Sequence, residues 1–73
     1  MQPIGKRVGR RIRVRRAELD MSQGDLANAL GISQGQVSHL EKGTRTITLE
    51  TLEAVAKAMR CRIEDFLCER EAA

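Results

Sequence analysis

Helix start and stop signals are placed at short intervals along the middle of the chain, and they limit its fold more than any other feature. Ser22, Ser33 and Thr48 are residue types that cap helix N-termini, because a side-chain oxygen accepts a hydrogen bond from a free backbone N–H. Gly31 and Gly43 suit the left-handed conformation that ends many helices. The spaces between these signals leave room for helices of about ten residues. The chain is therefore predicted to fold as short helices joined by tight turns.

Apolar periodicity predicts five helices and no strand, which is an all-α class. The first helix is expected over residues 5–19, where Val8, Ile12 and Leu19 share one face and Arg16 falls on the same face. A buried charge at that position needs a partner. The last helix is expected over residues 63–68, with fraying beyond it. The residues predicted to be buried in the second to fourth helices are Leu26, Ala27, Leu30, Val37, Leu40, Leu49, Leu52, Val55, Ala56 and Met59. The fifth helix offers the apolar residues Ile63, Phe66 and Leu67.

The length of 73 residues allows one small domain with a thin core. No apolar run approaches the roughly 18 residues of a membrane span, and no secretory signal follows the basic N-terminus. A single histidine and no convergent nucleophile or carboxylate set make an enzyme a poor hypothesis. Phe66 is the only aromatic residue, so a stacking surface for RNA is also missing.

The two cysteines, Cys61 and Cys68, are seven positions apart. On one helix they would lie roughly 10 Å apart, which is too far for a disulfide. With one histidine they cannot form a zinc site from this chain alone. They are expected to be reduced thiols in the cytoplasm, and no metal or cofactor is predicted.

Positive charge is concentrated in the first part of the chain. Residues 1–45 carry nine Lys and Arg against four Asp and Glu, whereas residues 46–73 carry four against six. Seven of the basic residues lie between Lys6 and Arg16. Such a segment attracts polyanions, although a charged helix face that only keeps a small protein in solution is an equally good explanation.

Residues 22–42 have the pattern of a helix, a tight turn and a second helix. Small Ala27 permits close approach of the two helices, and the second one is expected to project an outer face into the major groove of DNA. On that face Gln34 can bond adenine through two hydrogen bonds, and Ser38 and His39 follow one turn later.

The segments VGRRIRVRRAELDMSQ, LANALGIS, QVSHLEKGTR and ITLETLEAVAKAM together resemble the Cro/repressor helix-turn-helix family, which contains phage lambda repressor and Cro. The resemblance covers residues 4–67 and implies one compact lambda-repressor-like domain over residues 1–73. It implies that Arg16 pairs with Glu41, and that Gln23 contacts phosphate and braces Gln34. The residues expected to contact bases are Gln34, Gly35, Ser38 and His39, and those expected to contact phosphates are Ser22, Gln23, Gln36, Lys42, Thr44 and Arg45.

Some positions depart from the family pattern. Gly35 replaces a residue that often contacts a base, so reduced direct base contact is expected there; the alternative is a glycine that is merely tolerated in the first turn of the helix. Arg60 and Arg62 replace the usual glycine and hydroxyl caps, so an irregular junction is expected before the last helix. His39 is a candidate for a base contact, a phosphate contact or solvent exposure, and Arg10, Arg11, Arg13 and Arg15 are candidates for flanking DNA or for a solvated face.

The resulting hypothesis is a cytoplasmic, sequence-specific transcriptional regulator similar to controller proteins of restriction–modification systems or to small phage repressors. Its expected partners are double-stranded DNA with a two-fold operator, a second copy of the chain, and RNA polymerase; no membrane is involved. Ile63, Phe66 and Leu67 are candidates for the dimer interface, with core filling as the alternative for Phe66. The alternative function is an antitoxin-like protein-interaction module for which DNA binding is secondary.

Overall fold

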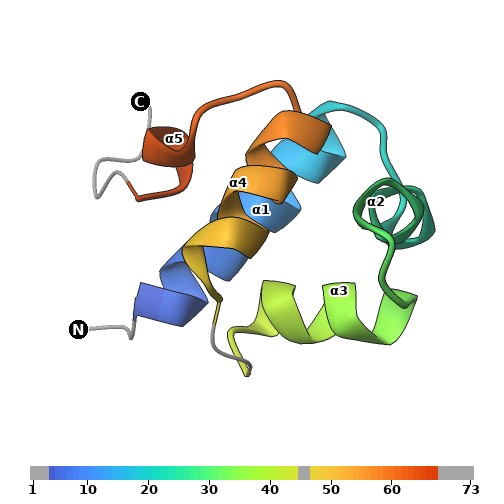
Figure 1. Cartoon of the computed structure of the whole chain (residues 1–73), viewed down its shortest axis with the longest axis horizontal. Coiled ribbons are helices and arrows are strands. Elements are labelled where there is room, and N and C mark those ends of the chain that lie inside the picture. Colours follow the sequence, from blue (N-terminus) through green and yellow to red (C-terminus); the bar gives the residue numbers. More distant parts are fainter. Residues whose placement is uncertain (1–3, 45–46, 68–73) are drawn as a thin grey trace.

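The computed structural model describes residues 4–44 and 47–67, which form five α-helices (Figure 1). No strand occurs in these residues, so the predicted all-α class is confirmed. Arg45, Cys68 and the predicted frayed end at residues 69–73 lie outside the described residues. The helices are α1 (Ile4–Glu18), α2 (Gln23–Leu30), α3 (Gln34–Lys42), α4 (Leu49–Ala58) and α5 (Ile63–Leu67).

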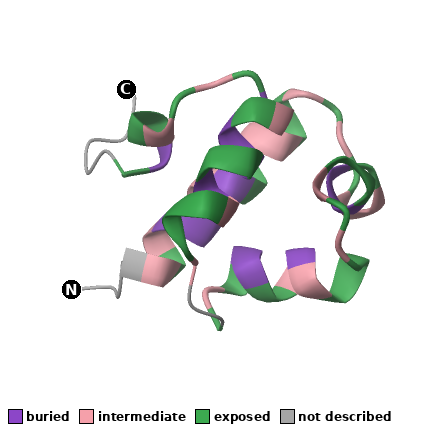
Figure 2. Cartoon of the chain, in the orientation of Figure 1, coloured by how far each residue is buried: buried purple, intermediate pink, exposed green. Residues whose placement is uncertain are grey.

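One apolar core joins all five helices, whose buried positions are turned towards each other (Figure 2). Helix α1 packs against α3 and α5, and α2 packs against α3 and α4. Complete burial of one such apolar side chain contributes roughly 1.5–3 kcal/mol, so these contacts dominate the stability of the domain. The most fully buried of the large side chains are Ile12, Leu26, Val37, Val55 and Met59.

Phe66 fills the core from α5 and is only 2% exposed. Its ring therefore offers almost no surface to a second subunit, which favours core filling over the alternative of a dimer contact. Ile63 is half-buried against the same core, whereas Leu67 is 39% exposed. Of the three residues considered for dimerisation, Leu67 is the one with a free apolar surface.

The prediction that Leu49 is buried was wrong, because its side chain is 70% exposed. Leu49 is the first residue of α4, and the α4 members of the core begin one turn later at Leu52. Periodicity identified the correct face of the helix, but that face extends beyond the region covered by the core.

The predicted caps start α2, α3 and α4. Ser22 Oγ accepts a hydrogen bond from Asp25 N–H at 2.9 Å, while a carboxylate oxygen of Asp25 accepts one from Ser22 N–H. Ser33 and Gln36 form the same reciprocal capping box at α3. Thr48 Oγ1 accepts from Thr51 N–H at 3.1 Å and caps α4. Each cap satisfies backbone donors that the helix leaves free, so these local signals set the helix starts.

Four of the helices end in the same way, with one residue at positive φ and the next N–H bonded to the carbonyl five positions earlier. This is the hydrogen-bond pattern of the Schellman motif. It closes α1 to α4 in turn, through the bonds Met21 to Arg16, Ile32 to Ala27, Thr44 to His39 and Cys61 to Ala56.

The irregularity expected before α5 is limited to the positive φ of Arg60. Arg60 adopts a φ of 53° and takes the place that Gly31 and Gly43 occupy at α2 and α3. Arg62 N–H donates to a carboxylate oxygen of Asp65 at 2.9 Å, so a side chain from within α5 replaces the missing hydroxyl cap. The backbone tolerates the unusual residues because the hydrogen bonds of a normal junction still form.

Glycine permits close contact between α1 and the end of α3. A Cβ atom on Gly9 would overlap the backbone carbonyl oxygens of Leu40 and Glu41. A Cβ atom on Gly43 would lie 2.7 Å from the Cα atom of Lys6. Two helices distant in the sequence are thus fixed against each other through backbone contacts.

Within the described part of the chain, no helix is long and apolar enough to cross a membrane, and no group of His, Cys, Asp and Glu is arranged to hold a metal ion. Cys61 lies half-buried against the core, and burial raises the pKa of its thiol above the ordinary value. The thiol therefore stays protonated and packs as a small, largely apolar group.

Candidate functional site

Helices α2 and α3 are joined by a tight turn at residues 31–33 (Figure 1). Helix α3 has one buried and one exposed side (Figure 2). Val37, Leu40 and Glu41 are buried on the inner side. On the other side, Gln34 and His39 are exposed and Ser38 is half-buried. The helix therefore presents polar side chains outward while its inner side is fixed by the core.

A buried ion pair fixes α3 to α1. Arg16 Nε donates to Glu41 Oε2 at 2.6 Å, and Arg16 Nη2 donates to Glu41 Oε1 at 3.2 Å. The side chain of Glu41 is only 4% exposed. This two-point contact gives Arg16 the partner that a charge on the buried face of α1 requires. Its hydrogen bond to Glu41 raises the pKa of Arg16 above the ordinary value, and Arg16 also donates to the carbonyl of Met21 at 2.8 Å.

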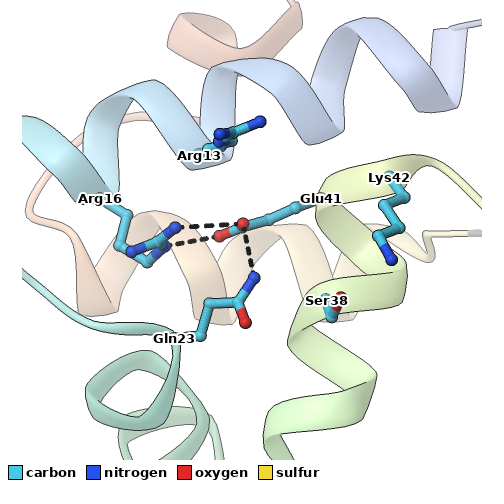
Figure 3. A pocket seen from close by; sticks show the side chains of 6 residues that line it. All are labelled: Arg13, Arg16, Gln23, Ser38, Glu41 and Lys42. Atoms are coloured by element: carbon cyan, nitrogen blue, oxygen red, sulfur yellow. Dashed lines mark hydrogen bonds and ion pairs between the residues drawn. The ribbon is translucent and has the colours of Figure 1, made fainter.

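Gln23 joins the same network. Its Nε2 donates to Glu41 Oε1 at 3.1 Å (Figure 3). This differs from the prediction that Gln23 braces Gln34, because the side-chain amide is directed towards the buried carboxylate instead. Three chain segments (α1, the start of α2 and α3) therefore meet at one carboxylate.

A pocket of about 290 Å³ opens beside this network (Figure 3). Arg13 from α1 and Lys42 from α3 stand on its border, and no ion pair joins either of them to another described residue. Because Arg16 already compensates Glu41, these two side chains leave the pocket with a net positive charge. The lining residues are Arg13, Arg16, Gln23, Ser38, Glu41 and Lys42.

Sequence reasoning did not separate Arg13 from the other arginines of α1. The available signal was its spacing, since Arg13 lies three residues before Arg16 and therefore on nearly the same side of the helix. Arg15, by contrast, is directed elsewhere: its Nε donates to the carbonyl of Met59 at 3.3 Å, and it pairs with Glu18.

Several of the other predicted contact residues already have structural partners. Ser22 and Gln36 belong to the capping boxes of α2 and α3. Hydrogen bonds from Ser22 N–H and O–H lower the pKa of Asp25, so the carboxylate of this capping box is charged at neutral pH. Thr44 follows α3, and its Oγ1 lies 2.9 Å from Nδ1 of His39.

The family model for the helix-turn-helix domain matches residues 12–66. An uncharacterised HTH-type transcriptional regulator of Sinorhizobium medicae is 38% identical over 64 residues, which are 88% of this chain and 46% of that protein. The control protein C.BamHI of Bacillus amyloliquefaciens is 32% identical over 60 residues, or 81% of this chain and 74% of that protein. This chain thus spans about half the length of the rhizobial relative.

The fold is also similar to that of the P22 c2 repressor, solved in complex with a synthetic operator. The TM-score is 0.75 at 33% sequence identity, covering 82% of this chain and 91% of the repressor chain. The five helices are therefore arranged as in a lambda-repressor-like domain.

Proposed function

Because this chain belongs to the helix-turn-helix family, we propose that it is a sequence-specific transcriptional regulator that inserts α3 into the major groove of operator DNA. The observation that carries the proposal is the two-sided character of α3. Its inner residues are buried, whereas the polar groups of its outer side are available for base edges. The operator-bound P22 c2 repressor, with a similar fold, supports the same mode of binding.

In this proposal, the side chain of Gln34 bonds an adenine and Ser38 and His39 contact bases further along the groove. The proposed role of Gly35 depends on the absence of a side chain. Its φ is not positive, and an added Cβ would make only ordinary contact with Ser33 Oγ at 3.8 Å. Because the fold does not require glycine there, we attribute Gly35 to close approach of the DNA.

The charged pocket supplies backbone contacts in this proposal. Arg13, Gln23 and Lys42 contact phosphates beside the groove, with Arg16 and Glu41 holding the pocket in shape. Ser22, Gln36 and Arg45 remain proposed phosphate contacts, whereas the hydroxyl and the N–H of Thr44 both donate within the domain, to the carbonyl of His39.

A single recognition helix covers too few base pairs to specify one site in a genome. We therefore propose a homodimer on a two-fold operator, with half-sites about 34 Å apart. Leu67 and Ile63 on α5 are the proposed contacts, and α5 lies on the opposite side of the domain from α3 (Figure 1). Such a regulator acts in the bacterial cytoplasm, where it meets RNA polymerase, and carries out no catalysis.

Selection from a random DNA library, followed by titration of the selected duplex and a scrambled duplex, tests the function. We expect a two-fold motif that binds about 10³-fold or more tightly than the scrambled duplex. Weak binding to every duplex, without enrichment of any motif, would contradict the proposal and direct the search to an antitoxin-like protein partner.

The variant Gln34→Ala tests the placement of α3. We expect specific affinity to fall by roughly 1–3 kcal/mol and the preference to relax at one operator position. Asn28→Ala removes an exposed amide from α2 and serves as the control. An equal loss on specific and scrambled DNA would show that Gln34 does not contact a base.

A further inference from the structure

The turn after α3 brings Thr44 back beside His39. Gly43 has a φ of 72° and packs against the backbone of Lys6 in α1. This conformation lets Thr44 N–H donate to the carbonyl of His39 at 3.1 Å. The position of Thr44 is therefore set by the core of the domain, although its side chain is exposed.

The hydroxyl of Thr44 makes two contacts with the same residue. Oγ1 lies 3.3 Å from the carbonyl oxygen of His39 and 2.9 Å from Nδ1 of its ring. A hydroxyl has one proton to donate, and a carbonyl oxygen only accepts. Both contacts form together when Thr44 donates to the carbonyl and accepts from a protonated Nδ1.

The hydrogen bond made by one ring nitrogen sets which nitrogen carries the proton in a neutral histidine. A proton on Nδ1 leaves Nε2 with a free lone pair, so Nε2 is then a hydrogen-bond acceptor. In the major groove, the groups that donate to an acceptor are the exocyclic amino groups, N6 of adenine and N4 of cytosine.

We propose that Thr44 is a positioning residue that holds His39 in the Nδ1–H tautomer and so makes it select an amino group of adenine or cytosine. The part of this inference that concerns DNA rests on the proposed function, whereas the tautomer is a property of the free protein. Thr44 also limits rotation of an exposed ring before binding, which lowers the entropy cost of ordering that ring at a base.

The first experiment determines the tautomer without DNA. His39 is the only histidine of the chain, so a long-range ¹H–¹⁵N NMR spectrum contains a single imidazole. The spectrum is recorded on the neutral ring, whose two nitrogens give distinct signals because only one of them carries a proton. We expect Nδ1 to be protonated in the wild type and in Thr44→Ser, and the proton to move largely to Nε2 in Thr44→Val.

A wild-type spectrum with the proton on Nε2 would overturn the proposal, as would a Thr44→Val spectrum identical to that of the wild type. Thr44 is exposed, so the valine variant is expected to fold, and its thermal melt verifies this. If Thr44→Ser keeps the wild-type tautomer, the effect comes from the hydroxyl group and not from the size of the side chain.

The second experiment uses the selected operator. His39→Ala identifies the base pair whose preference depends on the ring, and that pair is rebuilt with purine in place of adenine or 2-pyrimidinone in place of cytosine. Each analogue lacks the amino group. We expect the wild type and Thr44→Ser to lose about 5- to 150-fold in affinity on the analogue, and His39→Ala to lose far less.

Thr44→Val is expected to respond less to the analogue than the wild type does. Equal losses for the wild type and His39→Ala would overturn the amino-group assignment even if the tautomer is as proposed. Failure to select any operator would instead contradict the proposed function, and the NMR result would still decide the role of Thr44.

Discussion

Single residues carry unusual backbone strain at two of the helix ends. Asp20 and Arg60 have φ values of 55° and 53°, in the left-handed region that disfavours side chains with a Cβ. Gly31 and Gly43 occupy the equivalent places after α2 and α3. The left-handed turn therefore costs little free energy at the two glycines and more at the other two positions. Substitution at these two strained positions can increase the stability of the domain.

Replacement of Arg60 by glycine is expected to stabilise the domain. Relief of the left-handed strain, about 1–2 kcal/mol, exceeds the extra entropy that glycine brings to the unfolded chain, about 0.5–1 kcal/mol. Thermal unfolding should show a higher Tm for Arg60→Gly. Arg60→Ala removes the same side chain but keeps the Cβ, so a similar gain in that variant would contradict the explanation.

The Arg16–Glu41 ion pair is a second place where single side chains decide stability. Arg16→Met or Glu41→Leu leaves a buried charge without its partner, which costs roughly 3–5 kcal/mol. The double variant should recover most of the loss in urea denaturation, and Arg13→Met, an exposed neighbour, should change stability little. Losses that simply add in the double variant would exclude coupling between the two charges.

Among the helices, α3 depends on α1 as well as on α2 for its position. The buried carboxylate of Glu41 receives hydrogen bonds from Arg16 of α1 and Gln23 of α2, and Gly9 lets the α1 backbone approach the last turn of α3. The proposed recognition helix is thus held from two sides, and it cannot move alone without breaking the network.

Gly9→Ala should disturb this contact directly. The new Cβ would meet backbone carbonyl oxygens, which cannot move aside as a flexible side chain can, so a loss of roughly 1–3 kcal/mol or more is expected. Gly24→Ala is the matched control, because its Cβ would make only an ordinary contact at 3.6 Å and alanine favours a helix. Equal stabilities of the two variants in urea would show that α1 and α3 are less tightly packed than described.

Across the whole molecule, charge is divided between the two ends of the sequence. Basic residues dominate α1, whereas the segment from residue 46 onward carries six acidic residues against four basic ones. A polyanion is therefore attracted to the basic N-terminal part of the chain more than to the segment that contains α4 and α5.

Lys42 and Lys57 test this distribution of charge, because replacing either lysine by alanine lowers the net charge by the same amount. Lys42→Ala should reduce the slope of log affinity against log salt concentration by about 0.9, since one phosphate contact is lost. Lys57 is an exposed residue of α4, and Lys57→Ala should leave the slope unchanged. Equal slopes for the two variants would mean that charge acts through the whole molecule and not through the pocket.

Local signals were sufficient to predict the helices. Ser22, Ser33 and Thr48 cap them as expected, because a cap involves residues only three positions apart. The exposure of Leu49 was missed because periodicity identifies a helix face but does not show where the core ends. The positive φ of Arg60 was missed because residue type predicts glycine, and not arginine, in the left-handed conformation.

The site was only partly predictable for the same reason. The outer side of α3 follows from helix geometry, so Gln34 and His39 are exposed as expected. The position of Arg13 on the pocket depends on how α1 crosses α3, and the contact between His39 and Thr44 depends on the left-handed turn at Gly43. Such contacts become visible only when the helices have been placed in space.

The two-sided construction of α3 also bears on how proteins of this kind diverge. Substitutions at Gln34 or Gly35 remove no core contact. Under the proposed function, a descendant can therefore acquire a new target sequence in single steps while every intermediate remains folded. His39 and Thr44 are the exception, because their hydrogen bond means that a change in one alters the chemistry of the other. These two positions are therefore expected to vary together between closely related descendants with different targets.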